Sequence, residues 1–509
     1  MLVNPSKSLL TGLVFAAVAF GSPRPQPGLD IDLDIGIDLG FGLGGKSGRV
    51  DKAQLDNTLK SLAKIASENG GNRAFGLPGF DASADFIENT LRKFDTKKAF
   101  KIWRQPFEAQ FTQVTTHRLN VTEAESYVPQ TLNYSPSTPV GGVSAELAIV
   151  PGDAQPCNGE ELAATGADVT GKILLIERGS CPDGTTFAGK VKTAKAGGAI
   201  ATIIFNSQDA FITGGTLTAP NPEYVPAGLI QRAQGLALRE RVLAGEKLVV
   251  EYEQIQIFED RTTVNIIAET KAGNSENVIM LGAHLDGVQA GPGVNDDGSG
   301  TTLILELFRT LDTKRLKNKV RFAWWGAEEN GLLGSQHFVQ NLSSDEINDL
   351  LLYLNFDMVG RGYYGVFDGR NVTPRGLTPA PGSDVIEDLF RKFFESVNVP
   401  VTRANFTGGS DYHHFMEDLN KPVGGLHTGT GVDQDPCYHQ ACDGYDNVNQ
   451  TQLYINTLAA QTVLTKLVKD GADIIPKNRT TEFPKTKLLL NLPEPLEFVP
   501  GCGHDHDQV

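Results

Sequence analysis

From Val264 onward, apolar runs with strand character alternate with runs of helical character. The runs are NVIMLGAHLD, GSGTTLILELFRTL, KVRFAWWGAEE, GLLGSQHFVQNL and LLYLNFDMVG, in this order. Apolar strands that alternate with helices are typical of a largely parallel sheet with helices on both faces. The sequence therefore predicts a mixed α/β fold with a mostly parallel central sheet.

The rest of the chain differs in texture. Leucine and isoleucine at helical spacing predict two helices within 51–94. Short β-like runs such as KILLIERG and AIATIIFNS, with one helical run between them, predict a separate small domain. We expect six segments: a signal peptide at 1–21, a low-complexity propeptide or arm at 22–50, the first part of the main domain at 51–129, the small domain at 130–252, the rest of the main domain at 253–470 and a C-terminal tail at 471–509.

The first residues, MLVNPSKSLLTGLVFAAVAFGSP, have the features of a secretory signal peptide. Lys7 precedes an apolar run over 9–20, and small residues follow at the spacing of a cleavage site. The run is too short to cross a bilayer, and no later apolar stretch reaches that length. Seven N-x-S/T sequons agree with a secretory route: Asn120, Asn133, Asn341, Asn371, Asn405, Asn449 and Asn478. We expect a secreted protein, with a vacuolar location as the alternative.

Charge and cysteine content narrow the possible partners and compartments. The formal net charge is −16 and runs of Lys and Arg are absent, which argues against nucleic acid or an acidic membrane surface as partner. The five cysteines suit one or two disulfides in an oxidising compartment. Cys437 and Cys442 are close enough to close a tight loop, Cys157 and Cys181 are the next pair, and Cys502 is left over.

A histidine and several acidic residues follow the three apolar strands of the main domain. In strand order they are His284 with Asp286, Glu328 with Glu329, and Asp357. Because sites in such sheets form at the carboxyl ends of the strands, we expect these side chains to lie together.

The loop GPGVNDDGSG, residues 291–300, places two more carboxylates, Asp296 and Asp297, among glycines. Without cations, so much negative charge at one edge would be strongly repulsive. Histidine with Asp and Glu, and no thiolate, is the ligand set expected for zinc or a similar divalent ion in a catalytic site. The carboxylates exceed what one tetrahedral ion needs, which predicts two ions that share a bridging carboxylate, roughly 3.5 to 4 Å apart.

Other motifs fit the chain poorly. The loop lacks the acidic spacing of an EF-hand calcium site and the lysine of a P-loop. The sequence contains no G-x-S-x-G elbow, so a serine hydrolase is disfavoured.

The chain contains, in this order, GAHLD, GPGVNDDGSG, WWGAEENGLLGS, LNFDMVG, GGSDYHHF and CYHQACD. In order and spacing these motifs resemble the di-zinc aminopeptidases of the aminopeptidase Y and secreted fungal leucine aminopeptidase type. The resemblance covers about 264–465, and the segment 130–252 resembles the protease-associated domain inserted in many members. It implies a zinc exopeptidase fold, two Zn²⁺ per chain, and removal of N-terminal residues from peptides with a free N-terminus.

The resemblance also implies a role for each matching residue. The first zinc would be held by His284, Asp296 and Asp357, and the second by Glu329, His439 and the shared Asp296. Asp286 would orient His284, Glu328 would be the general base, and Tyr438 would donate to the oxyanion of the tetrahedral intermediate. A bridge between Cys437 and Cys442 would hold the loop that carries His439.

In one position the chain departs from the family's pattern, since Gly287 stands where relatives commonly have Ser. This position is not a ligand in the family, so we expect altered packing or specificity with activity kept. His413 and His414 are interpreted as pocket or structural groups, because the ligand set is already complete.

Two alternative functions stay open. A carboxypeptidase on the same scaffold would need a basic cluster for the substrate's carboxylate, and no Arg-rich segment lies near the motifs. A non-catalytic, peptidase-like binding protein should have lost ligands, whereas all the matched ligands and the base are present. We expect peptide substrates, no nucleic-acid or membrane partner, and a monomer or small oligomer.

Overall fold

The structure is a computed structural model that describes residues 48–477 except 123–124, 210–211, 213, 218 and 373–375. The predicted signal peptide, nearly all of the low-complexity segment, the tail from residue 478 and Cys502 lie outside the described residues. The predictions for those segments therefore stay predictions.

Within the described residues, thirteen strands form one sheet in the order β14-β13-β15-β12-β10-β11-β9-β4-β5-β6-β8, with β1 beside β9 and β2 beside β1. The strands of this sheet are β1 Phe100–Thr122, β2 Glu125–Tyr127, β4 Val143–Ile149, β5 Ile173–Glu177, β6 Ala201–Phe205, β8 Ala227–Ile230, β9 Val249–Thr270, β10 Asn274–His284, β11 Asn318–Trp325, β12 Leu350–Phe356, β13 Gly365–Phe367, β14 Thr402–Ala404 and β15 Val423–Leu426. A separate pair consists of β3 Thr131–Asn133 and β7 Gly214–Thr216.

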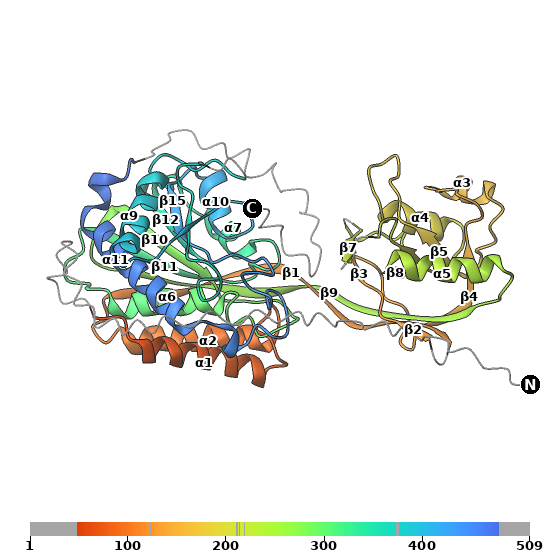
Figure 1. Cartoon of the computed structure of the whole chain (residues 1–509), viewed down its shortest axis with the longest axis horizontal. Helices are drawn as coiled ribbons and strands as arrows, with labels where there is room; N and C mark the ends of the chain where they lie inside the picture. The colour runs from red at the N-terminus through yellow and green to blue at the C-terminus, as the bar shows by residue number, and fades with distance from the viewer. Residues whose placement is uncertain are drawn as a thin grey trace, which may run out of the picture. The chain divides into compact units, whose positions relative to one another are not determined.

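The helices lie between the strands along the chain (Figure 1). They are α1 Lys52–Glu68, α2 Pro78–Phe94, α3 Gly159–Ala164, α4 Ala188–Ala196, α5 Arg232–Leu243, α6 Gly298–Thr310, α7 Leu333–Gln340, α8 Ser344–Asp349, α9 Ser383–Ser396, α10 Tyr412–Glu417 and α11 Gln450–Ile474, with a short 3₁₀ turn at Tyr445–Asn447. In the part that the structure describes, no helix is long and apolar enough to cross a membrane.

Parallel pairing dominates the region that carries the predicted ligands. β10 lies between β11 and β12 and is parallel to both, and β12 is parallel to β15. β9 and β13 add antiparallel edges to this parallel block. The prediction of a mixed, mostly parallel sheet is therefore confirmed.

Two neighbouring tryptophans show that helices cover both faces of the sheet. Side chains alternate along a strand, so Trp324 and Trp325 of β11 point to opposite faces. The Trp324 indole donates to the carbonyl of Thr301 in α6, whereas Trp325 packs on Phe338 of α7 and Phe415 of α10. Both rings are fully buried.

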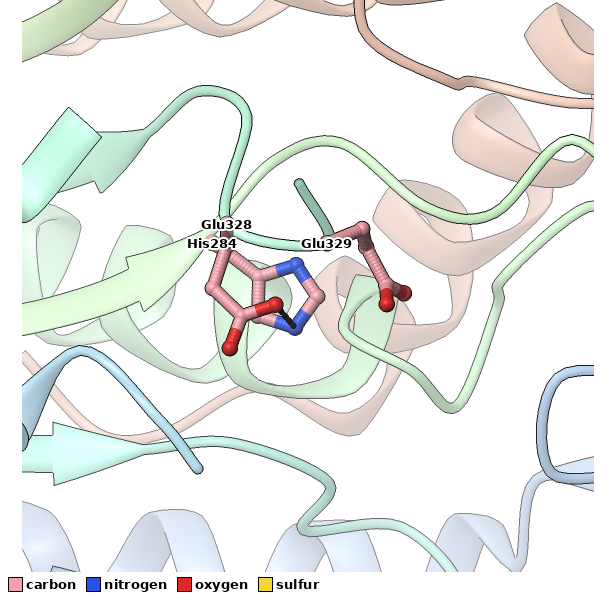
Figure 2. A group of neighbouring side chains, drawn as sticks. All are labelled: His284, Glu328 and Glu329. Atoms are coloured by element: carbon pink, nitrogen blue, oxygen red, sulfur yellow. Dashed lines mark ion pairs between the residues drawn. The ribbon is translucent and has the colours of Figure 1, made fainter. Parts of the chain in front are cut away.

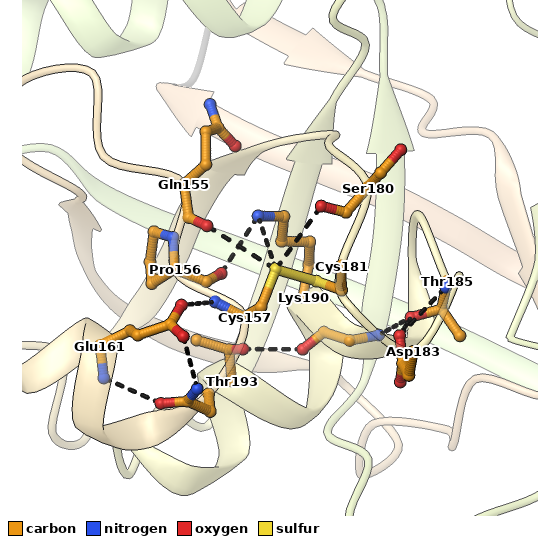
Figure 3. The surroundings of a disulfide bond; sticks show 12 residues. Gln155, Pro156, Cys157, Glu161, Ser180, Cys181, Asp183, Thr185, Lys190 and Thr193 are labelled. Atoms are coloured by element: carbon orange, nitrogen blue, oxygen red, sulfur yellow. Dashed lines mark hydrogen bonds between the residues drawn. A yellow bond between two sulfur atoms is a disulfide. The ribbon is translucent and has the colours of Figure 1, made fainter.

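The small domain is inserted between two long strands of the main sheet. β1 and β9 pair antiparallel from Phe100↔Thr270 to Asn120↔Glu251, and the inserted segment leaves at the end of β1 and returns at the start of β9. Its strands β4, β5, β6 and β8 are joined by parallel pairing. Cys157 and Cys181 form a disulfide within this domain (Figure 3).

Candidate active site

The predicted ligands come from loops that leave one edge of the parallel block. β10 ends at His284, β11 ends three residues before Glu328, and β12 ends one residue before Asp357. Since these strands are parallel neighbours, the three loops emerge side by side. The strand-end argument therefore correctly predicts that these side chains gather.

Asp296 lies between the two histidines. Its Oδ1 is 3.2 Å from Nε2 of His284, and its Oδ2 is 3.1 Å from Nε2 of His439. Each oxygen of one carboxylate thus faces a different imidazole, which is the arrangement expected of a bridging ligand.

The remaining carboxylates complete two overlapping groups around Asp296. Glu329 lies 3.0 Å from Nε2 of His439, and Asp357 lies 3.5 Å from Nε2 of His284. The ligand atoms of His284, Asp296 and Asp357 lie within 4.8 Å of one another, as do those of Asp296, Glu329 and His439. These are the two ligand sets that the resemblance implies.

Glu328 stands beside the first group. Its Oε2 is 3.9 Å from Nε2 of His284, and Figure 2 shows its carboxylate directed at the imidazole, with Glu329 beside them. Burial raises the pKa of Glu328 well above its ordinary value, and the nearby negative charge of Glu329 adds to the effect. Such a carboxylate can accept a proton near neutral pH, as a general base must.

The histidines report the negative potential of the site. Burial alone lowers the pKa of His284, but Glu328, Asp296 and Asp357 raise it to well above its ordinary value. For His439 the opposing groups are Glu329 and Asp296, and the net shift of the pKa is again upward. Protons on the histidines and bound cations are alternative ways to balance these carboxylates.

The donor set fits a zinc site. The five residues offer imidazole nitrogens and carboxylate oxygens and no thiolate, which suits zinc ligands in a catalytic site. Oε1 of Glu329 is buried and, among the described residues, has no hydrogen-bond partner. A buried carboxylate oxygen without a donor is costly, and a bound cation removes that cost.

Asp286 links the first two loops. Its carboxylate accepts the backbone amides of Glu328 at 3.0 Å and Glu329 at 3.3 Å. The carboxylate is 3.8 Å from Nδ1 of His284, whereas the backbone carbonyl of Asp286 is 3.2 Å from that nitrogen.

The loop of Tyr438 and His439 is closed by a disulfide between Cys437 and Cys442, whose Cα atoms are 5.3 Å apart. The Tyr438 ring stacks on the His439 ring with centroids 3.9 Å apart. Burial raises the pKa of Tyr438 well above its ordinary value, and Asp296 and Glu329 add to the shift. The phenol therefore stays protonated and can act as a donor.

Several residues that hold this arrangement have no role assigned from the sequence. Asp297 accepts the amides of His284 at 3.1 Å, Gly300 at 2.8 Å and Met358 at 3.1 Å, so one carboxylate fastens three segments. Its position beside Asp296 was the available signal.

Two further residues fasten the ligand loops. Asp443 accepts the amides of Asn295 at 2.9 Å and Asp296 at 3.0 Å, which ties the disulfide loop to the bridging loop. His427 follows β15 directly, and its Nδ1 lies 2.8 Å from the carbonyl of Asp357. The strand-end rule would have found His427 if it had been applied to this fourth strand.

The remaining candidates stand apart from the two groups. Nδ1 of His414 lies 2.8 Å from Asp418, and the rings of His413 and His414 meet edge to face with centroids 5.0 Å apart. Within the described residues, neither histidine belongs to a group that can hold a metal ion. A Cβ at Gly287 would be 3.6 Å from its nearest neighbours, so a side chain such as serine could start here without a clash.

Residues 265–463 match the family model described as peptidase family M28, and residues 143–238 match that of the PA domain. Leucine aminopeptidase 2 of Trichophyton rubrum is 34% identical over 481 residues, covering 89% of this chain and 91% of that protein. A probable lipoprotein aminopeptidase of Mycobacterium tuberculosis is 36% identical over 437 residues, covering 80% of this chain and 83% of that protein.

Solved structures agree with these matches. The aminopeptidase from Aneurinibacillus sp. strain AM-1 is 27% identical with a TM-score of 0.62, and the match covers 86% of this chain and 97% of that one. A zinc aminopeptidase from Bacillus subtilis shares the fold at 24% identity and a TM-score of 0.61, over 85% of this chain and 99% of that one. Sequence similarity along most of the chain and a shared fold lead to one conclusion: this chain belongs to peptidase family M28 and carries an inserted PA domain.

Proposed function

We propose that this chain is an aminopeptidase that holds two zinc ions and hydrolyses the N-terminal peptide bond of peptides with a free N-terminus. The observation that carries this proposal is the position of Asp296, whose two oxygens face His284 and His439 at 3.2 and 3.1 Å. The names of the relatives, which include leucine aminopeptidases and a zinc aminopeptidase, support it.

Five residues would hold the ions: His284, Asp296 and Asp357 on one side, and Glu329 and His439 with the shared Asp296 on the other. The chemistry that zinc supplies in such a site is activation of a water molecule and polarisation of the scissile carbonyl. Asp286, Asp297 and Asp443 hold the ligand loops through backbone amides.

The protons are moved by the protein. Glu328 would take the proton of the attacking water and pass it to the leaving amine, for which its raised pKa suits it. Tyr438 would donate its hydroxyl proton in a hydrogen bond to the oxyanion. The acidic edge would attract the ammonium group of the substrate's N-terminus, which accounts for exopeptidase specificity.

We infer further that the enzyme is secreted. The signal-peptide pattern, the sequons and the two disulfides support this location. A vacuolar location is the alternative.

The decisive experiment measures zinc and turnover on the same preparation of the full chain. We expect about two zinc ions per chain, hydrolysis of aminoacyl nitroanilides, and loss of hydrolysis on chelation that added zinc reverses. The matched control is the N-acetylated substrate, which should stay intact because it lacks the ammonium group. Cleavage of blocked peptides from the C-terminus would instead indicate a carboxypeptidase, and a zinc-free, inactive protein would indicate a binding protein.

A further inference from the structure

Arg73 lies between α1 and α2, far in sequence from every predicted ligand, yet it contacts the bridging loop. Its side chain is fully buried, with 0% of the residue exposed. Nε donates to the carbonyl of Pro292 at 3.0 Å, Nη2 donates to the carbonyl of Gly293 at 2.5 Å, and Nη1 donates to the carbonyl of Leu285.

These three carbonyls lie at the two ends of one loop, the 285–293 excursion that follows β10. Leu285 lies between His284 and Asp286, and Pro292 and Gly293 come shortly before Asp296. The guanidinium therefore ties the start of the excursion, next to the first ligand, to its end, next to the bridging ligand. Without Arg73, the carbonyls of Leu285 and Pro292 would lose this donor, and the carbonyl of Gly293 would keep only the amide of Gly298 at 3.1 Å.

The backbone around Gly293 leaves little freedom for another arrangement. Gly293 has a φ of +61°, and a Cβ there would lie 2.5 Å from the carbonyl oxygen of Asp296 and 3.3 Å from Nη2 of Arg73. The turn that precedes Asp296 is thus packed directly against the guanidinium.

The charge of Arg73 is balanced at a distance. Among the ion pairs of the described residues, none joins Arg73 to a carboxylate, which is unusual for a buried cation. The carboxylates of Asp286, Asp443, Asp297 and Asp296 nevertheless interact favourably with it. Its guanidinium donors therefore bond to backbone carbonyls of the loop and not to carboxylates.

We propose that Arg73 is a positioning residue that fixes the 285–293 excursion and thereby holds Asp296 where it bridges two zinc ions. This inference rests on the proposed di-zinc function. The α1–α2 segment is accordingly a functional part of the metal site.

Charge and positioning predict opposite effects when Arg73 is replaced. Removal of a nearby positive charge would by itself favour binding of a dication. Loss of the three hydrogen bonds frees the loop and weakens binding. Replacing a residue that orients a metal ligand typically lowers the affinity for the metal by about 10- to 100-fold. We expect Arg73→Met to weaken zinc binding by a similar factor.

Arg73→Lys separates the two contributions. Lysine keeps the charge, but its ammonium is a compact donor that cannot reproduce the planar fork serving three carbonyls. We therefore expect Arg73→Lys to bind zinc more weakly than the wild type as well.

The test is a zinc titration of the full chain against a chelator of known affinity, well below the unfolding temperature of each metal-free variant. Arg261→Met is the matched control. Arg261 also donates to a backbone carbonyl, that of Gly76 between α1 and α2, but its guanidinium lies over the Phe111 ring and not against the bridging loop. A residue that only stabilises the fold would lower the unfolding temperature without changing the zinc dissociation constant. Should Arg73→Met fail to fold, Arg73→Lys decides.

Weaker zinc binding in the Arg73 variants, with wild-type binding in Arg261→Met, supports the inference. Unchanged or tighter binding in Arg73→Lys and Arg73→Met overturns it. A wild type that binds no zinc would instead contradict the proposed function, so the two failures are distinguishable.

Discussion

Strands β10 to β12 in the peptidase part and strands β5, β6 and β8 in the inserted domain are both joined by parallel pairing. Polar residues follow the strands in both regions. In the inserted domain these residues satisfy one another: Arg232 pairs with Glu177 at 2.9 Å, and Gln231 and Gln234 cap α5 reciprocally. In the peptidase part the residues are mainly carboxylates, and Asp296 pairs with both His284 and His439.

The two regions also differ in their buried charged side chains. Lys190 of the inserted domain is fully buried, and its ammonium donates to the carbonyl of Pro156 at 3.1 Å and lies 3.6 Å from the sulfur of Cys157 (Figure 3). Its positive charge is opposed by the carboxylates of Glu161 and Glu177. A strand end thus becomes a candidate metal site where like charges accumulate, and position alone does not create one.

The largest effect is expected for Asp296→Asn, which removes the shared carboxylate. Loss of a residue that merely orients a metal ligand lowers the affinity for the metal by about 10- to 100-fold. Loss of the shared ligand itself should therefore weaken zinc binding by more than about 100-fold. Turnover should fall to the level of the chelated wild type. Zinc content after dialysis measures the binding, and nitroanilide hydrolysis measures the turnover. If Asp296→Asn kept two zinc ions, the strand ends of the peptidase part would not differ from those of the inserted domain in the way described.

The next largest effects are expected for Glu328→Gln and Glu329→Gln, which make the same substitution at two adjacent residues. Glu328→Gln should lower kcat by about 10²- to 10⁴-fold and keep its zinc, since only the base is lost. Glu329→Gln should lose one zinc ion. Equal metal loss in the two variants would show that the roles are assigned wrongly.

A smaller effect is expected in the pH dependence of stability after chelation. The pKa values of His284 and His439 in the folded protein lie above the ordinary 6.5, so protonation stabilises the fold below about pH 6.5 and this stability is lost as the pH rises through the folded-state values. The raised pKa of Glu328 acts in the same direction. The unfolding temperature of the chelated protein should therefore fall above pH 6.5, while that of the zinc-loaded protein stays nearly flat. Equal slopes in calorimetry would argue against a cation-dependent site.

The smallest effect is expected for Arg232→Gln in the inserted domain. The pair with Glu177 is partly exposed, so its loss should lower the free energy of unfolding by less than about 1 kcal/mol. Zinc content and kcat should match the wild type. A clear loss of zinc would show that the strand ends of the two regions are coupled.

The sequence predicted the strands, and that the side chains after them gather, because both depend on local pattern. The run 277–286 became β10, 319–329 became β11 with its loop, and the residues after them gathered as the strand-end rule requires. The same patterns predicted the small domain and the disulfide between Cys437 and Cys442.

Two residues that hold the predicted ligand loops, Arg73 and Asp443, could not be predicted in this way. Arg73 donates to backbone carbonyls more than two hundred positions away, and Asp443 accepts backbone amides across a separation of 147 residues. Contacts between a side chain and a distant backbone leave no periodicity or motif, because the backbone partner has the same groups whatever its side chain. Only the folded chain brings such partners together.

The pairing of β1 with β9 has an evolutionary consequence. The pairing of the two strands ends at Asn120 and Glu251, so the PA domain, matched at residues 143–238, is inserted at the tip of one long hairpin. A hairpin tip accepts extra sequence of any length without shifting the register of the strands below it. An insertion at this point would allow the domain to be gained or exchanged while the pairing from Phe100↔Thr270 to Asn120↔Glu251 stays the same.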